Sequence, residues 1–383
     1  MGILIGKKRK MIQIKKIKVH VYRYPLKIPV RTSFGTMSNR PMVLVQVIDN
    51  QGNEGWGEIW CNFPSVGAEY RARLVDSIIA PLLLSKPYDN ASLIFSELTR
   101  TTEVLAIQTG EYGPLAQCIA GIDIAINDLL AKKKAIPIWK MFGGTSDKIL
   151  AYASGINPSQ AMDMGTKAIN LGFSSLKLKI GFGNERDLSN LTILREMIGD
   201  EGSLMADVNQ GWQLTEALAN IPMLKSFNLD WLEEPILANL PSSDWEHLRS
   251  ISSIPLAAGE NMMSYNEFED AIDQRILSVI QPDLAKWGGF TCCLPIARKI
   301  VASGLKYCPH YLGGGIGLLA SAHALAAVGG GGALEIDVNE NPLRTNLIEQ
   351  ILEVKNGAAT IGHNPGLGVY PNLEKIEKYK VPY

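Results

Sequence analysis

Three acidic residues in the second half of the chain each end an apolar run. They are Asp207 in LMADVNQ, Glu233 in LDWLEEP and Glu260 in IPLAAGE. Their spacing is about 26 residues, the length of a strand, a helix and two loops, so we expect them at the same ends of neighbouring parallel strands. Crowded carboxylates repel one another unless a cation holds them, and Mg²⁺ takes oxygen ligands. The pattern therefore predicts a magnesium site.

Other candidate strands also end in side chains that could do chemistry. Lys177 and Lys179 stand two residues apart in SLKLKIG, so both can face the same way. The remaining members of this set are Asn209 in DVNQ, Asp283 in IQPDLAKWGG, His310 in YCPHYLGGG and Glu335 in ALEID. Together with the acids, they form a candidate active site in which lysine or imidazole bases stand near a cation.

The elements that would position these residues alternate regularly from about residue 149. Amphipathic stretches separate most of the apolar runs, as in 185–199, where Leu188, Leu191 and Leu194 share one helical face. The strand candidates are 149–155, 175–180, 203–208, 229–234, 254–260, 277–283, 305–310 and 333–337. Eight strands with seven helices predict an α/β fold, a (β/α)7β TIM-like barrel over 146–345, whose active site lies at the carboxyl ends of the strands.

The first part of the chain has a different order, with strands followed by helices. Alternating stretches lie at 12–24 and 42–49, tight turns follow, and EGWGEIW is a further short strand. Helices are expected around 68–84, 90–107 and 114–133. This order predicts an α+β domain over 11–145.

The two ends of the chain are expected to lie outside these domains. We expect residues 1–10, MGILIGKKRK, to be a poorly ordered extension with a solvated basic run. Residues 346–383 contain a loop and a short amphipathic end, and we expect them to pack back on the first domain.

Length, composition, net charge and cysteine spacing limit the classes of protein that are possible. The 383 residues accommodate one barrel and a smaller domain, and 46% hydrophobic with 20% charged residues is ordinary for a soluble globular protein. The net charge of −1 does not favour nucleic acid or an anionic membrane, and no stretch approaches the roughly 20 apolar residues of a membrane span. The five cysteines lack C-x-x-C spacing, so we expect reduced thiols in a cytoplasmic protein.

The motifs K-x-K, D-x-N, E-x-P, G-E-N and P-D-x-x-K-x-G-G occur in this order and are followed by a late histidine and glutamate. In this order and spacing they resemble the mandelate racemase subgroup of the enolase superfamily (the mandelate racemase/muconate lactonizing enzyme family), across essentially the whole chain. The resemblance implies a capping domain on the barrel, Mg²⁺, a small-molecule carboxylate substrate and a homo-oligomer.

The resemblance also implies catalytic roles. Lys179 matches a base on one face of the substrate, and Lys177 matches a lysine that contacts the substrate carboxylate. Asp283 and His310 match a His–Asp dyad on the opposite face. Glu335 matches an acid that hydrogen-bonds to the enolised carboxylate.

A second set of matches concerns the metal. Asp207, Glu233 and Glu260 match its ligands, with Glu233 chosen because the family's glutamate stands two residues before the proline. Glu234 then lies beside the ligand. Asn209 matches a polar contact near the metal.

These roles agree with the chemistry of removing a proton α to a carboxylate. The proton is very weakly acidic, and Mg²⁺ with a lysine ammonium would stabilise the charge that develops. The base must be neutral near pH 7, so we expect Lys177 and the cation to lower the pKa of Lys179. Asp283 would orient His310. Bases on both faces allow racemisation or the elimination of water.

Several functions remain open at this point. The muconate-lactonising and dipeptide-epimerase relatives carry a lysine at the position of Asp283, so this chain favours the mandelate racemase arrangement. We favour dehydration of an acid sugar or hydroxy acid. A racemase or epimerase of a hydroxy acid or amino-acid derivative, a lactonising cycloisomerase and a non-catalytic metal-binding protein are the alternatives.

Specificity is expected from two capping-domain loops, about 25–40 and 60–67, that close over the barrel in the family. Arg31, Ser33 and Phe34 are the candidate substrate contacts. The glycines at 313–315 follow His310 closely. Their amides could bind a carboxylate or phosphate, or the glycines could simply let the loop turn.

Overall fold

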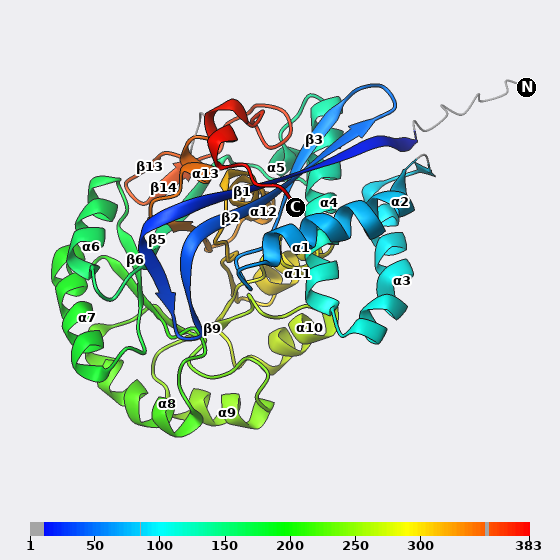
Figure 1. The fold of residues 1–383 in the computed structure, drawn as a ribbon. Helices are drawn as coiled ribbons and strands as arrows, with labels where there is room; N and C mark the ends of the chain where they lie inside the picture. The colour runs from blue at the N-terminus through cyan, green and yellow to red at the C-terminus, as the bar shows by residue number, and fades with distance from the viewer. Residues whose placement is uncertain (1–10, 85, 349–351) are drawn as a thin grey trace, which may run out of the picture.

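The computed structural model describes residues 11–84, 86–348 and 352–383. The extension expected at residues 1–10 lies outside the described residues. The described chain forms a strand-and-helix unit beside a larger ring of alternating strands and helices (Figure 1).

The first unit is built on an antiparallel sheet. Its strands are β1 (Ile12–Thr32), β2 (Gly35–Asp49), β3 (Glu54–Ile59) and β4 (Pro87–Tyr88), in the order β3-β2-β1-β4. Its helical elements are α1 (Gly67–Leu74), the π-helical turn η1 (Val75–Ile79), α2 (Ala80–Leu83), α3 (Ala91–Thr109) and α4 (Tyr112–Lys133). Strands followed by helices confirm the expected α+β capping domain.

The segment 25–40 is a long hairpin in the structure, although the sequence analysis expected a loop. Within this segment β1 and β2 pair as far as Thr32 and Gly35, with a register irregularity between Pro25 and Val30. Proline cannot donate a ladder hydrogen bond, which accounts for the irregularity, and Val30 resumes the pairing as a buried residue. The tip of the hairpin reaches over the strands of the ring (Figure 1).

Helix α4 covers the sheet and is long and apolar enough to cross a membrane by length and composition alone. The sequence analysis found no such stretch. In the fold, 83% of the helix's apolar window is buried inside the protein, because α4 packs against β3 on one side and the barrel on the other. The core helix of a soluble domain has the same properties.

The second unit is the barrel. Within the described residues, eight parallel strands run in the order β12-β5-β6-β7-β8-β9-β10-β11, separated along the chain by seven helices, α6 to α12. The strands are β5 (Lys148–Ile156), β6 (Ser175–Lys179), β7 (Ser203–Asp207), β8 (Trp231–Glu233), β9 (Leu256–Ala258), β10 (Val279–Ile280), β11 (Lys306–Tyr307) and β12 (Ala333–Asp337).

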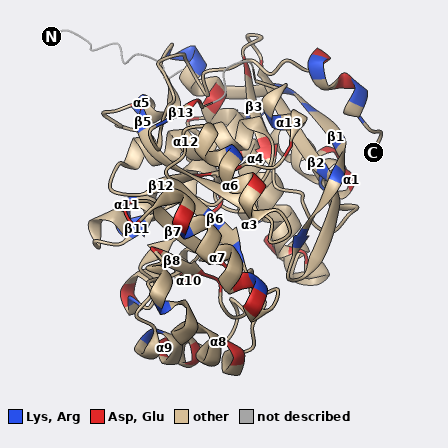
Figure 2. Ribbon diagram, turned by 90° about the vertical axis from the view of Figure 1, so that its left-hand side faces the viewer, with Lys and Arg blue, Asp and Glu red and all other residues tan. Residues whose placement is uncertain are grey.

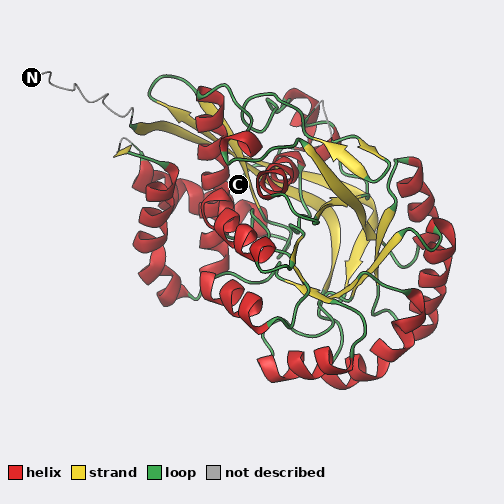
Figure 3. Cartoon of the chain, turned by 180° about the vertical axis from the view of Figure 1, so that it is seen from behind, coloured by secondary structure: helices red, strands yellow, loops and turns green. Residues whose placement is uncertain are grey.

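The helices form the outer layer of this ring, as Figure 3 shows from behind. They are α6 (Ala161–Asn170), α7 (Asn184–Ile198), α8 (Leu214–Asn220) continued by the 3-10 turn η2 (Ile221–Phe227), α9 (Ser242–Ile251), α10 (Tyr265–Gln274), α11 (Gly289–Ala302) and α12 (Gly315–Val328). The first and last strands of the order, β12 and β11, lie close together. The amide of Ala333, at the start of β12, donates to Sγ of Cys308, directly after β11, at 3.4 Å. The expected (β/α)7β arrangement is confirmed.

The outer surface of the ring carries charges of both signs. In Figure 2, lysines and arginines alternate with aspartates and glutamates on helices such as α7, α8 and α9, and neither sign forms a continuous stripe in that view. This distribution agrees with the net charge of −1.

An apolar layer inside the barrel supports the candidate site. Its buried members come from five strands and the position directly after β11, and are Tyr152, Met205, Trp231, Ala257, Val279 and Cys308. Residues two apart on a strand face the same way. Five of these residues are followed two positions later by a polar side chain: Ser154, Asp207, Glu233, Gln281 and His310. The polar layer therefore lies one step nearer the carboxyl ends of the strands.

The remaining elements join the two units. Helix α5 (Ile138–Met141) leads into the barrel, and α13 (Pro342–Thr345) follows it. The hairpin β13 (Val354–Lys355) and β14 (Ala358–Thr360) pairs with β5, and the last turn, η3 (Glu374–Tyr379), contacts β1. Beyond it, the Val381 amide donates to the Val21 carbonyl at 3.0 Å.

The domain boundaries given above remain predictions. The five cysteines are all buried and free.

Candidate active site

Lys177 lies at the centre of the polar layer. Its side chain is 1% exposed, and its Nζ donates to both carboxylate oxygens of Glu233 at 2.7 Å and lies 2.8 Å from Glu335 Oε1. Burial alone would lower the pKa of Lys177, but the charges of Glu233 and Glu335 outweigh it and raise the pKa well above its usual value. Lys177 is therefore a fixed positive charge.

Lys179 ends the same strand and is more accessible, with a side chain 13% exposed. Its Nζ lies 2.5 Å from Asp207 Oδ2 and donates to Asn209 Oδ1 at 2.6 Å. The sequence analysis expected a lowered pKa for Lys179. Burial acts in that direction, but the directly contacting carboxylate of Asp207 outweighs burial and the repulsion from Lys177, so the pKa is raised.

His310 and Asp283 form a hydrogen-bonded pair across neighbouring strands. His310 Nδ1 lies 2.8 Å from Asp283 Oδ2, while Asp283 Oδ1 accepts the amides of Ala285 at 2.8 Å and Lys286 at 3.2 Å. Those amides hold the carboxylate still, so it can orient the imidazole. The structure thus brings together the two residues of the expected dyad.

The other ring nitrogen of His310 points toward the acids. Nε2 lies 2.6 Å from Glu260 Oε2 and 3.9 Å from Glu335 Oε2. Burial alone would lower the pKa of His310, but Glu260, Glu335 and the Asp283 hydrogen bond raise it well above its usual value. Burial would raise the pKa of Glu260, and His310 and Lys286 lower it well below its usual value.

The three predicted metal ligands lie where expected, at the ends of consecutive strands. Strand pairing places Asp207 beside Glu233, and Glu260 follows the next strand. Each contacts a different positive side chain, respectively Lys179, Lys177 and His310. Among the residues that the structure describes, no group of three or more His, Cys, Asp or Glu side chains is gathered into a ready metal site.

The chemistry of this donor set fits a hard cation. Burial raises the pKa of Glu233 to about 7, Lys177 opposes the shift, and the charges of Asp207 and Glu335 add to it. Burial and then the charges of Glu260 and Asp207 raise the pKa of Glu234 to about 8. Burial and the neighbouring acids disfavour the charged form of Glu233, and a bound Mg²⁺ would stabilise that form. Asp207, Glu233 and Glu260 would hold the cation.

One of the three predicted capping-domain contacts, Ser33, reaches the barrel strand ends. Ser33, at the tip of the β1–β2 hairpin, donates to the backbone carbonyl of Asn209. Phe34 is 61% exposed and stacks edge-to-face on Phe63, with ring centroids 5.0 Å apart. Arg31 is exposed on β1 opposite Thr36 and, within the described part of the chain, makes no hydrogen bond or ion pair with the charged cluster.

Several contacts in the site were missed by sequence reasoning. Ser154 donates to Glu335, and Gln281 Nε2 donates to Glu233 Oε2 at 2.7 Å. Trp60 of the capping domain lies against Lys286, whose Nζ is 4.8 Å from the ring centroid. Ser154 and Gln281 could have been found, since each stands two positions after an inward-facing strand residue. Trp60 lies in the segment 60–67, which the sequence analysis expected to close over the barrel without naming this residue.

The amides after His310 are occupied by the protein itself. The Gly314 amide donates to Glu58 Oε1 at 2.5 Å and the Gly317 amide to Glu58 Oε2 at 2.9 Å. Glu58 belongs to β3 of the capping domain. The sequence analysis left open whether the amides of 313–315 bind a carboxylate, and in the structure Glu58 of the same chain binds the amide of Gly314.

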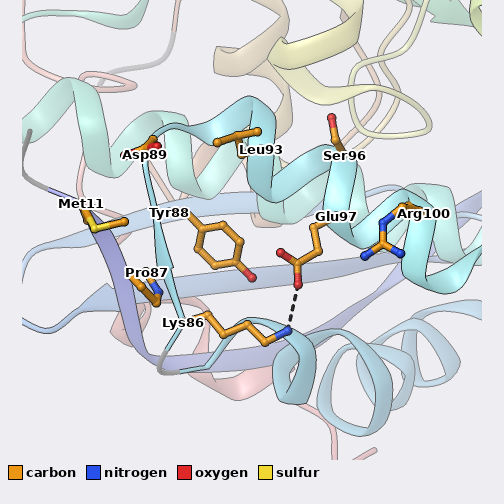
Figure 4. Close-up of a pocket in the computed structure, with 9 residues that line it drawn as sticks. All are labelled: Met11, Lys86, Pro87, Tyr88, Asp89, Leu93, Ser96, Glu97 and Arg100. Atoms are coloured by element: carbon orange, nitrogen blue, oxygen red, sulfur yellow. Dashed lines mark hydrogen bonds and ion pairs between the residues drawn. The ribbon is translucent and has the colours of Figure 1, made fainter.

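One surface hollow, of about 190 Å³, borders the site and is lined in part by Glu234 and Asn261. Another, of about 510 Å³, is formed in the capping domain by Met11, β4 and the start of α3 (Figure 4). The ion pair of Lys86 and Glu97, 2.8 Å apart, borders it. No residue of the candidate site lines this hollow.

Comparison with known proteins supports the arrangement. Residues 14–143 match the family described as the mandelate racemase/muconate lactonizing enzyme N-terminal domain, and residues 161–376 match the enolase C-terminal domain-like family. A solved structure described as a mandelate racemase/muconate lactonizing enzyme from Bordetella bronchiseptica RB50 is 48% identical, with a TM-score of 0.91 over 96% of this chain and 99% of that one.

Two curated relatives have named activities. The D-galactarolactone cycloisomerase of Agrobacterium fabrum is 28% identical over 97% of this chain and 100% of its own. The L-talarate/galactarate dehydratase of Salmonella typhimurium is 30% identical over 76% of this chain and 71% of its own. Its structure, liganded with Mg and L-lyxarohydroxamate, superposes with a TM-score of 0.85 at 25% identity over 100% of this chain and 97% of that one. The chain therefore belongs to the mandelate racemase/muconate lactonizing enzyme family of the enolase superfamily.

Proposed function

We propose that this protein is a Mg²⁺-dependent enzyme that removes the α-proton of a small carboxylate substrate and eliminates water from an acid sugar or hydroxy acid. One observation carries the proposal. Lys179 ends β6, and the His310–Asp283 pair ends β10 and β11, with the carboxylates of the intervening strand ends between them. A substrate in that space would have a basic group on each face.

The roles follow from the contacts. Lys179 would take the α-proton on one face, and His310, oriented by Asp283, would deliver a proton to the departing hydroxyl on the other. Lys177, a buried ammonium held by Glu233 and Glu335, would lie at the substrate carboxylate. Mg²⁺ held by the three strand-end acids would supply Lewis-acid stabilisation of the charge that develops there.

Binding of the substrate and the cation would also lower the pKa of Lys179. Its pKa is raised by one dominant partner, Asp207. If that carboxylate binds a cation, the ammonium loses the partner that stabilises it, and repulsion from Lys177 then favours the neutral base. This step reconciles the raised pKa with a catalytic role.

Two further activities share the same arrangement. Racemisation would need His310 to return a proton to carbon on the opposite face, which the present geometry also supports. Lactone isomerisation is favoured by the similarity to the D-galactarolactone cycloisomerase. The chain has Asp283 where the muconate-lactonising relatives carry a second catalytic lysine. Asp283 therefore favours a His–Asp dyad over a pair of lysines.

The capping-domain contacts, the oligomeric state and the cellular location are also part of this proposal. We place Arg31, Ser33 and Phe34 on the substrate-facing side of the capping domain, with Ser33 best supported by its contact to the Asn209 backbone. We further propose a homo-oligomer in the cytoplasm, a location supported by the five free thiols.

The decisive experiment is proton NMR in D₂O with Mg²⁺ against acid sugars, hydroxy acids and N-substituted amino acids. Loss of water from one compound identifies a dehydratase and its substrate. Deuterium entering the α-position without elimination identifies a racemase or epimerase, and lactone rearrangement identifies a cycloisomerase. A parallel sample with EDTA should show none of these reactions, and EDTA-resistant turnover would contradict the metal assignment.

A further inference from the structure

Glu58 of the capping domain is a buried carboxylate that holds the chain directly after His310. It is 2% exposed, and its two oxygens accept the amides of Gly314 and Gly317 in the first turn of α12. The first amides of a helix have no partner within the helix, and a negative charge there is favourable. Glu58 therefore caps a barrel helix from another domain.

Asp123 caps the barrel helix α11, which follows Asp283 in the chain. It lies on α4, is 2% exposed and accepts the amide of Thr291 at 3.0 Å and its hydroxyl at 2.5 Å, in the first turn of α11. The fit is close, since a Cβ added to Gly289 would lie 2.4 Å from Asp123 Oδ2. The helix start and the carboxylate cannot shift independently.

Only short segments separate these caps from the dyad, and further contacts hold those segments. After His310, the amide of Tyr311 donates to Glu335 at 3.2 Å and the carbonyl of Leu312 accepts from Asn62 Nδ2 at 2.6 Å. After Asp283, the Ala285 carbonyl accepts the Trp60 amide at 3.3 Å. Asn62 and Trp60 also belong to the capping domain.

The two capping carboxylates are held rigidly relative to each other. Strand β3, which carries Glu58, packs backbone to backbone on α4, which carries Asp123. A Cβ added to Gly57 would lie 2.0 Å from the Gly121 carbonyl oxygen, and one added to Gly55 would lie 2.0 Å from that of Ala125. Only glycine permits this approach, so β3 and α4 act as one rigid support.

We propose that Glu58 and Asp123 are positioning residues that set the distance and angle between His310 and Asp283. One holds the strand-end loop of each dyad member, and the shared support of β3 and α4 fixes the two loops relative to each other. In this arrangement the capping domain orients the acid–base pair in addition to covering the substrate. The inference rests on the proposed function for its catalytic consequence, but its geometric content can be tested without a substrate.

The test compares Glu58→Gln and Asp123→Asn with Asp187→Asn in the full-length protein. Asp187 is the matched control, because it is a buried carboxylate that accepts the amides of Gly181 and Phe182 before another barrel helix, α7, and touches neither dyad loop nor the support of β3 and α4. The first readout is the downfield proton resonance of the His310 Nδ1–H bonded to Asp283, assigned by its loss in His310→Asn. We expect it to shift or disappear in Glu58→Gln and Asp123→Asn and to persist in Asp187→Asn.

The second readout is steady-state kinetics on the substrate found by NMR. We expect kcat to fall roughly 10- to 100-fold in the two positioning variants with little change in KM, since a misplacement of about 1 Å has effects of that size. The pH-profile limb assigned to the dyad should move, while solvent exchange by Lys179 on the other face should continue.

Milder variants keep the test decisive if the first pair does not fold. Asn62→Ala removes one bond to the His310 loop and Thr291→Val removes one bond to Asp123, and each should shift the same resonance. An unchanged His310 resonance in folded Glu58→Gln and Asp123→Asn, or in both milder variants, overturns the inference. That outcome differs from failure of the proposed function, in which the resonance responds but no substrate is turned over.

Discussion

At the scale of single residues, the two lysines of β6 differ in how tightly they are held. Lys177 contacts Glu233 and Glu335 within 2.8 Å and is 1% exposed, whereas Lys179 is 13% exposed and has one close carboxylate, Asp207. A base must release and take up a proton, which a lysine bound by several carboxylates cannot readily do. This difference supports the proposal that Lys179 transfers the proton and Lys177 stabilises the developing charge.

Replacing either proposed base should remove turnover. We expect Lys179→Ala and His310→Asn each to lower kcat by about 10²–10⁴-fold, the usual contribution of a positioned acid or base, while Mg²⁺ binding by calorimetry persists. Lys299→Ala breaks an exposed ion pair with Glu269 and serves as the control, with wild-type rates expected. Wild-type turnover in both base variants would contradict the mechanism.

At the scale of elements, strand β3 and helix α4 come into backbone contact at glycines. A Cβ added to Gly57 would lie 2.0 Å from the Gly121 carbonyl oxygen, and one added to Gly121 would lie 2.4 Å from the Ile59 side chain. This contact is what lets Glu58 and Asp123 reach two barrel helices from one rigid support.

We expect Gly57→Ala to destabilise the protein by about 1–3 kcal/mol or more, because the added methyl would lie 2.0 Å from a backbone oxygen and the elements must separate. Urea unfolding measures the change. Gly331→Ala is the control, since nothing lies within 4 Å of its added Cβ and its φ is not positive, and it should be nearly neutral. Equal stability of the two variants would show that β3 and α4 are not tightly packed.

At the scale of the whole molecule, a buried ion pair joins the capping domain to the last barrel strand. Arg40 of β2 lies 2.7 Å from Asp337 of β12, with side chains 1% and 2% exposed, and Arg344 lies 3.5 Å from the same carboxylate. Breaking such a pair leaves a buried charge without its partner, which is more harmful than removing both members.

Asp337→Leu should therefore destabilise the protein by about 3–5 kcal/mol, whereas Arg40→Met combined with Asp337→Leu should recover part of that loss. Chemical denaturation of Arg40→Met, Asp337→Leu and the double variant gives the coupling energy. If the effects of the single variants simply add, the pair does not join the domains.

The second prediction at this scale concerns pH. His323 on α12 is fully buried, its Nδ1 accepts the Trp139 amide at 3.1 Å, and burial lowers its pKa from 6.5 to about 4. The unfolded chain therefore binds a proton that the folded chain excludes, so the stabilisation is complete above pH 6.5 and declines as pH falls toward 4. The loss over that window is ~3 kcal/mol.

Comparison with His323→Asn isolates this contribution, because asparagine can accept the Trp139 amide but does not titrate. The variant's unfolding free energy should depend less on pH between 6.5 and 4 than that of the wild type. Parallel pH profiles for the two proteins would rule out His323 as the titrating group.

The sequence by itself determined the order of elements, the barrel and the inward phase of its strands, because these depend on local periodicity and spacing. Lys177, Lys179, Asp207 and Glu233 could be placed at strand ends for that reason. Only the tertiary structure decided that 25–40 forms a hairpin, that Asp207 rather than a neighbouring lysine dominates the pKa of Lys179, and that Glu58 and Asp123 hold the dyad loops. Each of these depends on contacts between residues far apart in the chain, and no local pattern of residue types encodes which distant partner a side chain will meet.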